Sequence, residues 1–174
     1  RQAYGNAELI ARDAWPECNL RWNTLAGLGW VETRHGTYNG NWLRPSKLDE
    51  NGYPDPPIIG IALDGSNGTA HTPDTDGGQF DGDAEFDRAV GPLQFIPSSW
   101  SHVGRDANGD GVADPNQIDD AALGAAALLC FGGRNMDKSE DWEAGILNYN
   151  QSRDYLERVA AAANSYSIPQ PASS

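Results

Sequence analysis

Glu32 is the residue of this sequence best suited to acid–base chemistry. It ends the segment 20–33, in which Leu25, Leu28 and Gly29 recur at three- and four-residue steps, so the expected helix points Glu32 toward its packed side. A place in the last turn and partial burial both raise the pKa of a carboxyl group. A glutamic acid that is still protonated at about pH 6 can donate its proton to a leaving oxygen, as glycosidic bond cleavage requires. The alternative is a surface carboxylate that only flanks the helix end.

The elements that would position Glu32 are helices at both ends of the chain. We expect Asn19 to cap the helix 20–33, Asp137 and Glu140 to form a capping box, and Ser152 to cap the last helix. Between 34 and 89 no helical period persists, glycine turns recur, and the best strand candidate is 58–63. The sequence predicts a single, mainly α domain with long Gly/Asp-rich loops and at most a short β element. The expected helices are 7–15, 20–33, 98–103, 118–130, 141–148 and 153–166.

Charge and hydropathy exclude several classes of protein. The chain of 174 residues has 12 basic and 25 acidic residues and a formal net charge of −13, which disfavours binding to nucleic acid. The apolar stretch 121–133 is shorter than the roughly 20 residues that span a bilayer, so we expect no membrane span. The first residue is Arg1 and no signal sequence is visible, as in a processed or trimmed protein. We expect a monomer.

Two cysteines, Cys18 and Cys130, form an even set without the spacing of a zinc site. One alternative is a pair of buried, reduced thiols. The interpretation we favour is one disulfide that closes a loop of over a hundred residues in an exported protein.

Three blocks of sequence resemble, in order, the motifs of one enzyme family. The first is an apolar helix that ends in Glu32-Thr33-Arg34-His35-Gly36. The second runs from Gly91-Pro92-Leu93-Gln94-Phe95 through Pro97 to Trp100, and the third is Tyr149-Asn150 with Tyr155. The ordered set, which covers about 14–166, resembles the B-type lytic murein transglycosylases in their actinobacterial, secreted form.

This resemblance implies a lysozyme-like catalytic domain over 1–166, a flexible tail at 167–174, and a secreted or wall-associated enzyme. Its substrate would be the glycan strands of peptidoglycan. Glu32 would protonate the oxygen between N-acetylmuramic acid and N-acetylglucosamine, and the 2-acetamido group of the substrate would stabilise the developing charge. Ionised Glu32 would then take a proton from the C6 hydroxyl, so that a 1,6-anhydro ring closes without water or cofactor.

The same resemblance implies substrate-binding roles for Thr33, Gln94, Tyr149 and Asn150. Tyr149 and Asn150 would contact Glu32 or the reacting sugar, and Gln94 would hold an acetamido or hydroxyl group. Each also has a plainer interpretation: Tyr149 as a core ring, Gln94 as a turn cap, and Thr33 as a hydroxyl bonded to its own helix. Three tryptophans either stack on sugars or fill the core: Trp30, Trp42 and Trp100.

A calcium loop is indicated at 106–120. Oxygen ligands at positions 1, 3 and 5 and the glycine at position 6 match the first half of an EF-hand, but Gln117 stands where its final Glu should be. The family resemblance implies a fifteen-residue variant that ends at Asp120. The predicted ligands of a structural Ca²⁺ are Asp106, Asn108, Asp110, the Val112 carbonyl and Asp120; the alternative is a turn loop without metal.

The acidic stretch 74–87 leaves further alternatives open. It is a solvated series of turns by default, or a second cation loop, or a rim of the sugar site. Asp81, Asp83 or Asp87 would also serve as the general base of a rival mechanism, that of a hydrolytic muramidase or chitinase-like glycosidase. A third hypothesis is a non-catalytic module that binds the cell wall.

Overall fold

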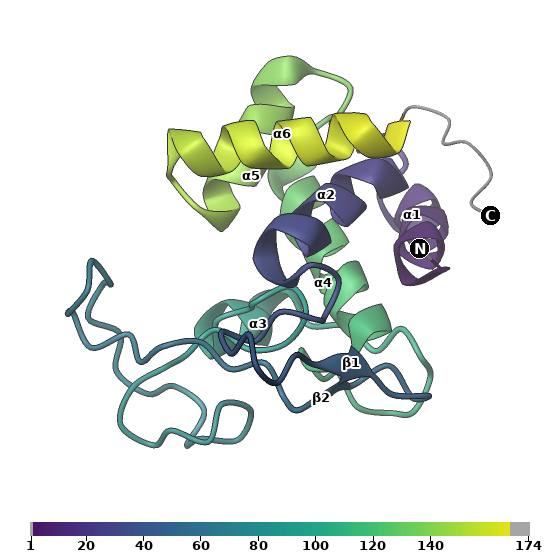
Figure 1. The fold of residues 1–174 in the computed structure, drawn as a ribbon. Helices are drawn as coiled ribbons and strands as arrows, with labels where there is room; N and C mark the ends of the chain where they lie inside the picture. Colours follow the sequence, from purple (N-terminus) through teal and green to yellow (C-terminus); the bar gives the residue numbers. More distant parts are fainter. Residues whose placement is uncertain (1, 168–174) are drawn as a thin grey trace.

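The computed structural model describes residues 2–167, which form six α helices and one two-stranded sheet (Figure 1). The mainly α prediction is confirmed. The tail expected after 166 lies outside the described residues, except for Ser167, which ends α6. The helices are α1 (Gln2–Ala14), α2 (Trp22–Thr33), α3 (Pro97–Val103), α4 (Ile118–Cys130), α5 (Ser139–Tyr149) and α6 (Arg153–Ser167), and the antiparallel strands are β1 (Lys47–Leu48) and β2 (Pro54–Asp55).

Helix α4 forms the centre of the core. Its sequence is rich in alanine and leucine, so most of its residues are buried and other helices approach it from several sides. α1, α2, α3 and α5 all pack against it, and Figure 1 shows it passing behind α2. Burial of this apolar surface is the main force that holds the helices together.

Helix α2 is packed most extensively against α6, which crosses over it in Figure 1. Gly27 makes the close crossing possible, because a Cβ atom there would lie only 3.0 Å from the backbone nitrogen of Ala163. The side chain of Asn23 donates to the carbonyl of Ala163 at the same crossing. These contacts join the first half of α2 to the last turns of α6, so the two helices run antiparallel and the end of α2, where Glu32 lies, is directed toward the first turns of α6.

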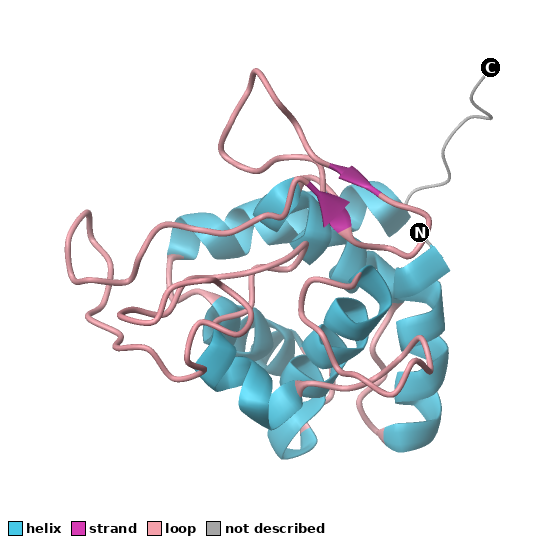
Figure 2. Cartoon of the chain, turned by 90° about the horizontal axis from the view of Figure 1, so that it is seen from below, coloured by secondary structure: helices cyan, strands magenta, loops and turns pink. Residues whose placement is uncertain are grey.

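The loops form a separate layer. Figure 2, seen from below, shows them in front of the helices and extending beyond them. The strand predicted at 58–63 is wrong: Ile59 makes only an isolated bridge with Val90, while Leu63 and Thr72 join a loop network. Pairing of Lys47 with Asp55 gives the small sheet instead.

Two of the predicted helix caps are wrong. Asn19 has a left-handed backbone and donates to Glu17 and Asn135, and α2 begins later, after Arg21. Asp137 caps nothing, because α5 starts after Lys138 without a side-chain cap. Ser152 does accept a hydrogen bond from the Tyr155 backbone, as predicted for the start of α6.

The predicted disulfide is confirmed. Cys18, in the turn after α1, is bonded to Cys130 at the end of α4, across 112 positions of sequence. The bond joins two packed helices of the core and is consistent with an extracellular protein. Among the described helices, none combines the length and the apolar character that crossing a membrane requires.

Candidate active site

Glu32 is half-buried in the last turn of α2, directly before a sharp end of the helix. Arg34 takes a left-handed conformation there, and the backbone nitrogens of Arg34 and His35 donate to the carbonyls of Trp30 and Gly29. Leu25 and Leu28 on the same stripe are fully buried, as expected. The helix therefore presents the carboxyl group at the boundary between the core and solvent.

Tyr155 of α6 is the direct partner of Glu32. Its hydroxyl donates a hydrogen bond of 2.6 Å to Oε1 of Glu32. Burial raises the pKa of Glu32 from 4.5 to about 7, although the hydrogen bond from Tyr155 and the charge of Arg158 both lower that pKa. A carboxyl group with this pKa can give up a proton and take one back near neutral pH.

Tyr149 lies close enough to Glu32 for the two groups to interact electrostatically. Burial, and then the charge of Glu32, raise the pKa of Tyr149 well above its ordinary value. The ring packs on Phe95, and the buried hydroxyl has no hydrogen-bond partner among the described residues. An unsatisfied buried hydroxyl is costly and calls for a reason, such as a ligand atom that accepts or donates there.

Thr33 connects the end of α2 to the second motif. Its buried hydroxyl donates to the carbonyl of Pro92 at 2.6 Å and accepts from the backbone nitrogen of Gly36 at 2.9 Å. Gly91, directly before Pro92, has a φ of 80°, and a Cβ there would collide with the carbonyl of Pro115, so this part of the second motif requires glycine. These contacts hold the backbone next to Glu32 in place, which is a positioning role. The contact of Thr33 with substrate stays a prediction.

The side chains of Gln94 and Asn150 make local hydrogen bonds. Gln94 has a left-handed backbone, and its amide nitrogen donates to the carbonyl of Gly91 at 2.9 Å. Asn150 is the C-cap residue directly after α5, and its side-chain oxygen accepts a hydrogen bond from the Ser152 backbone. The plainer interpretation of Gln94 as a turn cap fits this geometry, and neither residue is bonded to Glu32.

His35, in the first motif, has a role that the sequence did not suggest. One ring nitrogen is hydrogen-bonded to the Tyr4 hydroxyl at 2.9 Å and the other to the hydroxyl of Tyr166. The residue after the α2 cap thereby joins α1 to α6. The sequence signal that could have indicated this role is the position of His35 directly after the expected end of the helix.

On the expectation that Glu32 is a catalytic acid acting on peptidoglycan, Tyr155→Phe should lower kcat about tenfold to a hundredfold, since hydrogen bonds to charged groups contribute about 1.5–3 kcal/mol. Because that bond lowers the pKa of Glu32, its loss raises this pKa and moves the alkaline limb of the kcat/KM profile to higher pH. The measurement is the pH–rate profile on purified peptidoglycan. Tyr4→Phe, which removes a hydroxyl bonded to His35, is the matched control and should leave the limb in place. A limb that does not move in Tyr155→Phe contradicts the role.

The acidic loop 106–120 brings three predicted ligands together. Asp106, Asp110 and Asp120 can each place one oxygen within 4.8 Å of the others. Asp120 is fully buried, and its pKa is raised by that burial and also by the charge of Asp106. Asp106 accepts from the backbone nitrogens of Gly109 and Gly111, which folds the loop around its carboxylate. Asn108 and Val112 lie within the same loop and bond to Asp110.

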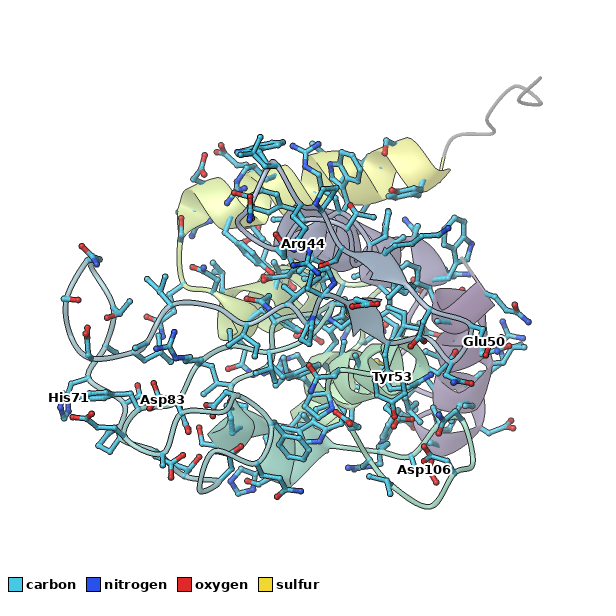
Figure 3. The ribbon with its side chains drawn as sticks, turned by 60° about the horizontal axis from the view of Figure 1, so that its bottom comes forward. Arg44, Glu50, Tyr53, His71, Asp83 and Asp106 are labelled. Atoms are coloured by element: carbon cyan, nitrogen blue, oxygen red, sulfur yellow. A yellow bond between two sulfur atoms is a disulfide. The ribbon has the colours of Figure 1, made fainter. Side chains whose placement is uncertain are left out.

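A second acidic cluster consists of Asp74, Asp76, Asp81 and Asp87, with oxygens within 4.8 Å of one another. The stretch is a series of turns, as expected by default, but Asp81 and Asp87 are buried within it rather than solvated. Asp87 accepts from the backbone and hydroxyl of Thr75, and Asp81 accepts from the Arg88 backbone. Figure 3 shows Asp83, beside this cluster, and Asp106 at well-separated places in the loop layer.

The three tryptophans divide between core and surface. Trp100 is buried and donates to the carbonyl of Ala113, so it is a core residue. Trp30 and Trp42 are exposed, Trp30 beneath the guanidinium of Arg34 and Trp42 against the ring of Tyr38. The two exposed rings are available to a ligand.

Comparison of the chain with protein-family models, with curated proteins and with solved structures found no match.

Proposed function

We propose that the protein is a lytic transglycosylase that cleaves the bond between N-acetylmuramic acid and N-acetylglucosamine in peptidoglycan. The observation that carries the proposal is Glu32, a half-buried carboxyl with a pKa of about 7 held by the Tyr155 hydroxyl. Its place at the end of α2, within the first of the three family-like motifs, supports the same conclusion. The disulfide supports a secreted or wall-associated location.

In the proposed mechanism Glu32 acts twice. Protonated Glu32 first donates its proton to the glycosidic oxygen, which leaves as the 4-hydroxyl of N-acetylglucosamine. The substrate's own acetamido oxygen stabilises the positive charge at C1 of the muramoyl residue. Glu32, now ionised, takes the proton of the C6 hydroxyl, and O6 closes the 1,6-anhydro ring. Tyr155 would orient the carboxyl group, and the Tyr149 hydroxyl, which lacks a partner among the described residues, would bond to the substrate.

The single-carboxylate mechanism agrees better with the described residues than the hydrolytic alternative. The groups that shift the pKa of Glu32 include no aspartate. Backbone hydrogen bonds, and also Arg88, lower the pKa of Asp83 to about 2, which leaves a poor general base. Asp81 and Asp87 are hydrogen-bonded within their loop.

Product analysis distinguishes the two mechanisms. We expect a digest of purified peptidoglycan to release muropeptides that end in 1,6-anhydromuramic acid, lighter by one water than the hydrolysis products. Mass spectrometry before and after borohydride reduction gives the answer, because an anhydro end is not reduced. Reducible muramic acid ends would establish the hydrolase, and intact strands would exclude both.

We also propose that the loop 106–120 binds Ca²⁺ as a structural ion. Three carboxylates and the Asn108 amide supply the all-oxygen donor set that a hard cation prefers. A cation would offset the burial, and also the charge of Asp106, that raise the pKa of Asp120. The loop is bound to the turn between β1 and β2 through Gln117, which donates to the carbonyl of Asn51. The ion would therefore stabilise the loop layer and take no part in the chemistry.

We expect millimolar Ca²⁺ to raise the Tm by several degrees and EDTA to lower it, because the ion binds the folded state only. Asp120→Asn should abolish the response, measured by thermal unfolding and by calorimetric titration. Asp13→Asn, at an exposed carboxylate of α1 outside both acidic clusters, is the matched control that should preserve it. A Tm that ignores both Ca²⁺ and EDTA contradicts the site.

A further inference from the structure

The segment that follows Glu32 differs in charge from the rest of the molecule. Residues 33–48 contain no Asp or Glu, although the chain as a whole has 25 acidic and only 12 basic residues. Three of those basic residues, Arg34, Arg44 and Lys47, lie within this segment, and all three are exposed. None of the three takes part in an ion pair within residues 2–167. The segment is a positive surface on an acidic protein, and Figure 3 labels Arg44 on it.

The segment is held in one conformation by its own polar groups. The backbone nitrogens of Thr37 and Tyr38 donate to the carbonyl of Thr33, directly after Glu32. Asn39 bonds to the Arg44 carbonyl and to the Ser46 hydroxyl, which spans the base of the loop. The Asn41 side chain accepts from the backbone of Leu43. The exposed side chains are therefore displayed on an ordered loop next to the site.

Those exposed side chains include large rings. Trp42 is 77% exposed, Leu43 is 96% exposed, and the Tyr38 and Trp42 rings lie 5.0 Å apart. Trp30, 41% exposed, has the Arg34 guanidinium 4.6 Å above its ring. Exposed aromatic rings supply flat apolar area at a low cost in conformational entropy, and arginine pairs with carboxylates through two parallel hydrogen bonds.

We propose that residues 34–47 form a docking surface for peptide-bearing glycan, in which Trp42 and Tyr38 contact sugar rings and Arg34, Arg44 and Lys47 bind the carboxylates of the peptide stems. Charge complementarity carries the assignment: the stems are anionic, and within the described part of the chain these cations form no ion pair with a carboxylate. The position, anchored at the residue after Glu32, places the surface beside the bond to be cleaved. The inference rests on the proposed function and specifies its substrate as stem-bearing rather than bare strands.

The test measures binding to insoluble peptidoglycan in a Glu32→Gln background, so that no cleavage occurs. The probes are wall sacculi freed of phosphate polymers, either intact or stripped of peptide stems by an amidase. We expect the triple variant Arg34→Gln/Arg44→Gln/Lys47→Gln to bind intact sacculi at least about tenfold more weakly and with less salt dependence. Its binding to stripped sacculi should equal that of the parent. Trp42→Ala should weaken binding to both probes.

A charge-matched variant is Arg12→Gln/Arg21→Gln/Lys138→Gln, which removes three exposed cations outside the segment and should bind as the parent does. Equal loss in both triple variants, equal loss on both probes, or no loss would overturn the inference. So would a triple variant that loses only binding to phosphatidylglycerol vesicles, or only self-association in sedimentation. Stem-dependent binding by a protein whose wild type cleaves no strand would retain the docking surface and exclude the proposed enzyme.

Discussion

Glu32→Gln is expected to reduce the proposed transglycosylase activity about 10²–10⁴-fold, because the amide can neither donate the first proton nor accept the second. The same change should stabilise the fold at alkaline pH. Since the pKa of Glu32 is about 7 in the fold and 4.5 when exposed, the unfolded chain loses this proton first as the pH rises. Glu32 therefore lowers the free energy of unfolding progressively across that interval, and Gln removes the loss.

The two effects of this substitution are measured separately. Product release gives the activity, and urea unfolding at several pH values gives the stability. The free energy of unfolding of Glu32→Gln should exceed that of the wild type by about 3 kcal/mol at about pH 8 and match it at about pH 4. Glu143→Gln, an exposed carboxylate of α5, is the matched control and should change neither quantity. Full product release in Glu32→Gln would exclude Glu32 as the catalytic acid, whereas a wild type that binds the wall, releases no product and binds equally well as Glu32→Gln would favour the non-catalytic wall-binding module.

Removal of the disulfide is the second change with a large expected effect. The bond closes a loop with a sequence separation of 112, and its loss should cost about 3–5 kcal/mol, chiefly by relaxing a constraint on the unfolded chain. For a domain of this size that corresponds to a fall in Tm of about 10 °C. The Cys18→Ala/Cys130→Ala variant, followed by circular dichroism, tests the expectation.

Reductant provides the control for this variant. Dithiothreitol should lower the Tm of the wild type toward that of the double variant and leave the double variant unchanged. Below its own Tm the double variant should retain activity, because Glu32 and Tyr155 belong to α2 and α6, which contain no cysteine. A wild type that is insensitive to reductant, with thiols accessible after reduction, would contradict the stabilising role.

The helices were largely predictable from sequence, because apolar periodicity reports burial directly. The expected helix 118–130 matches α4, and 153–166 matches α6 within one residue. The errors occur where local polar groups compete for the backbone. Asn19 is a residue type that often caps helices, but here it has a left-handed backbone. Ile59 lies in an apolar sequence typical of a strand, but within the described residues it forms only an isolated bridge with Val90. Such choices depend on partners distant in sequence.

The site was predictable as a set of motifs but not as a set of contacts. Glu32 could be found from its place on a buried stripe of α2, and the acidic loop from the spacing of its oxygens. The sequence motif favoured Tyr149 and Asn150 as contacts of Glu32 or the sugar. Tyr149 and Tyr155 flank the same turn, and only the packing of α5 and α6 separates them. In the structure Tyr155 makes the hydrogen bond to Glu32, whereas the hydroxyl of Tyr149 has no hydrogen-bond partner among the described residues.

The hydrogen bond between Tyr155 and Glu32 joins residues 123 positions apart. A ribosome makes α2 early and α6 late, so a growing chain contains the proton donor long before it contains the residue that orients it. The crossing of α6 over α2 also supplies much of the packing around α2. We therefore expect the proposed activity to appear in a single step, when α6 packs onto α2. A chain cleaved between α5 and α6 should still contain Glu32 but be inactive.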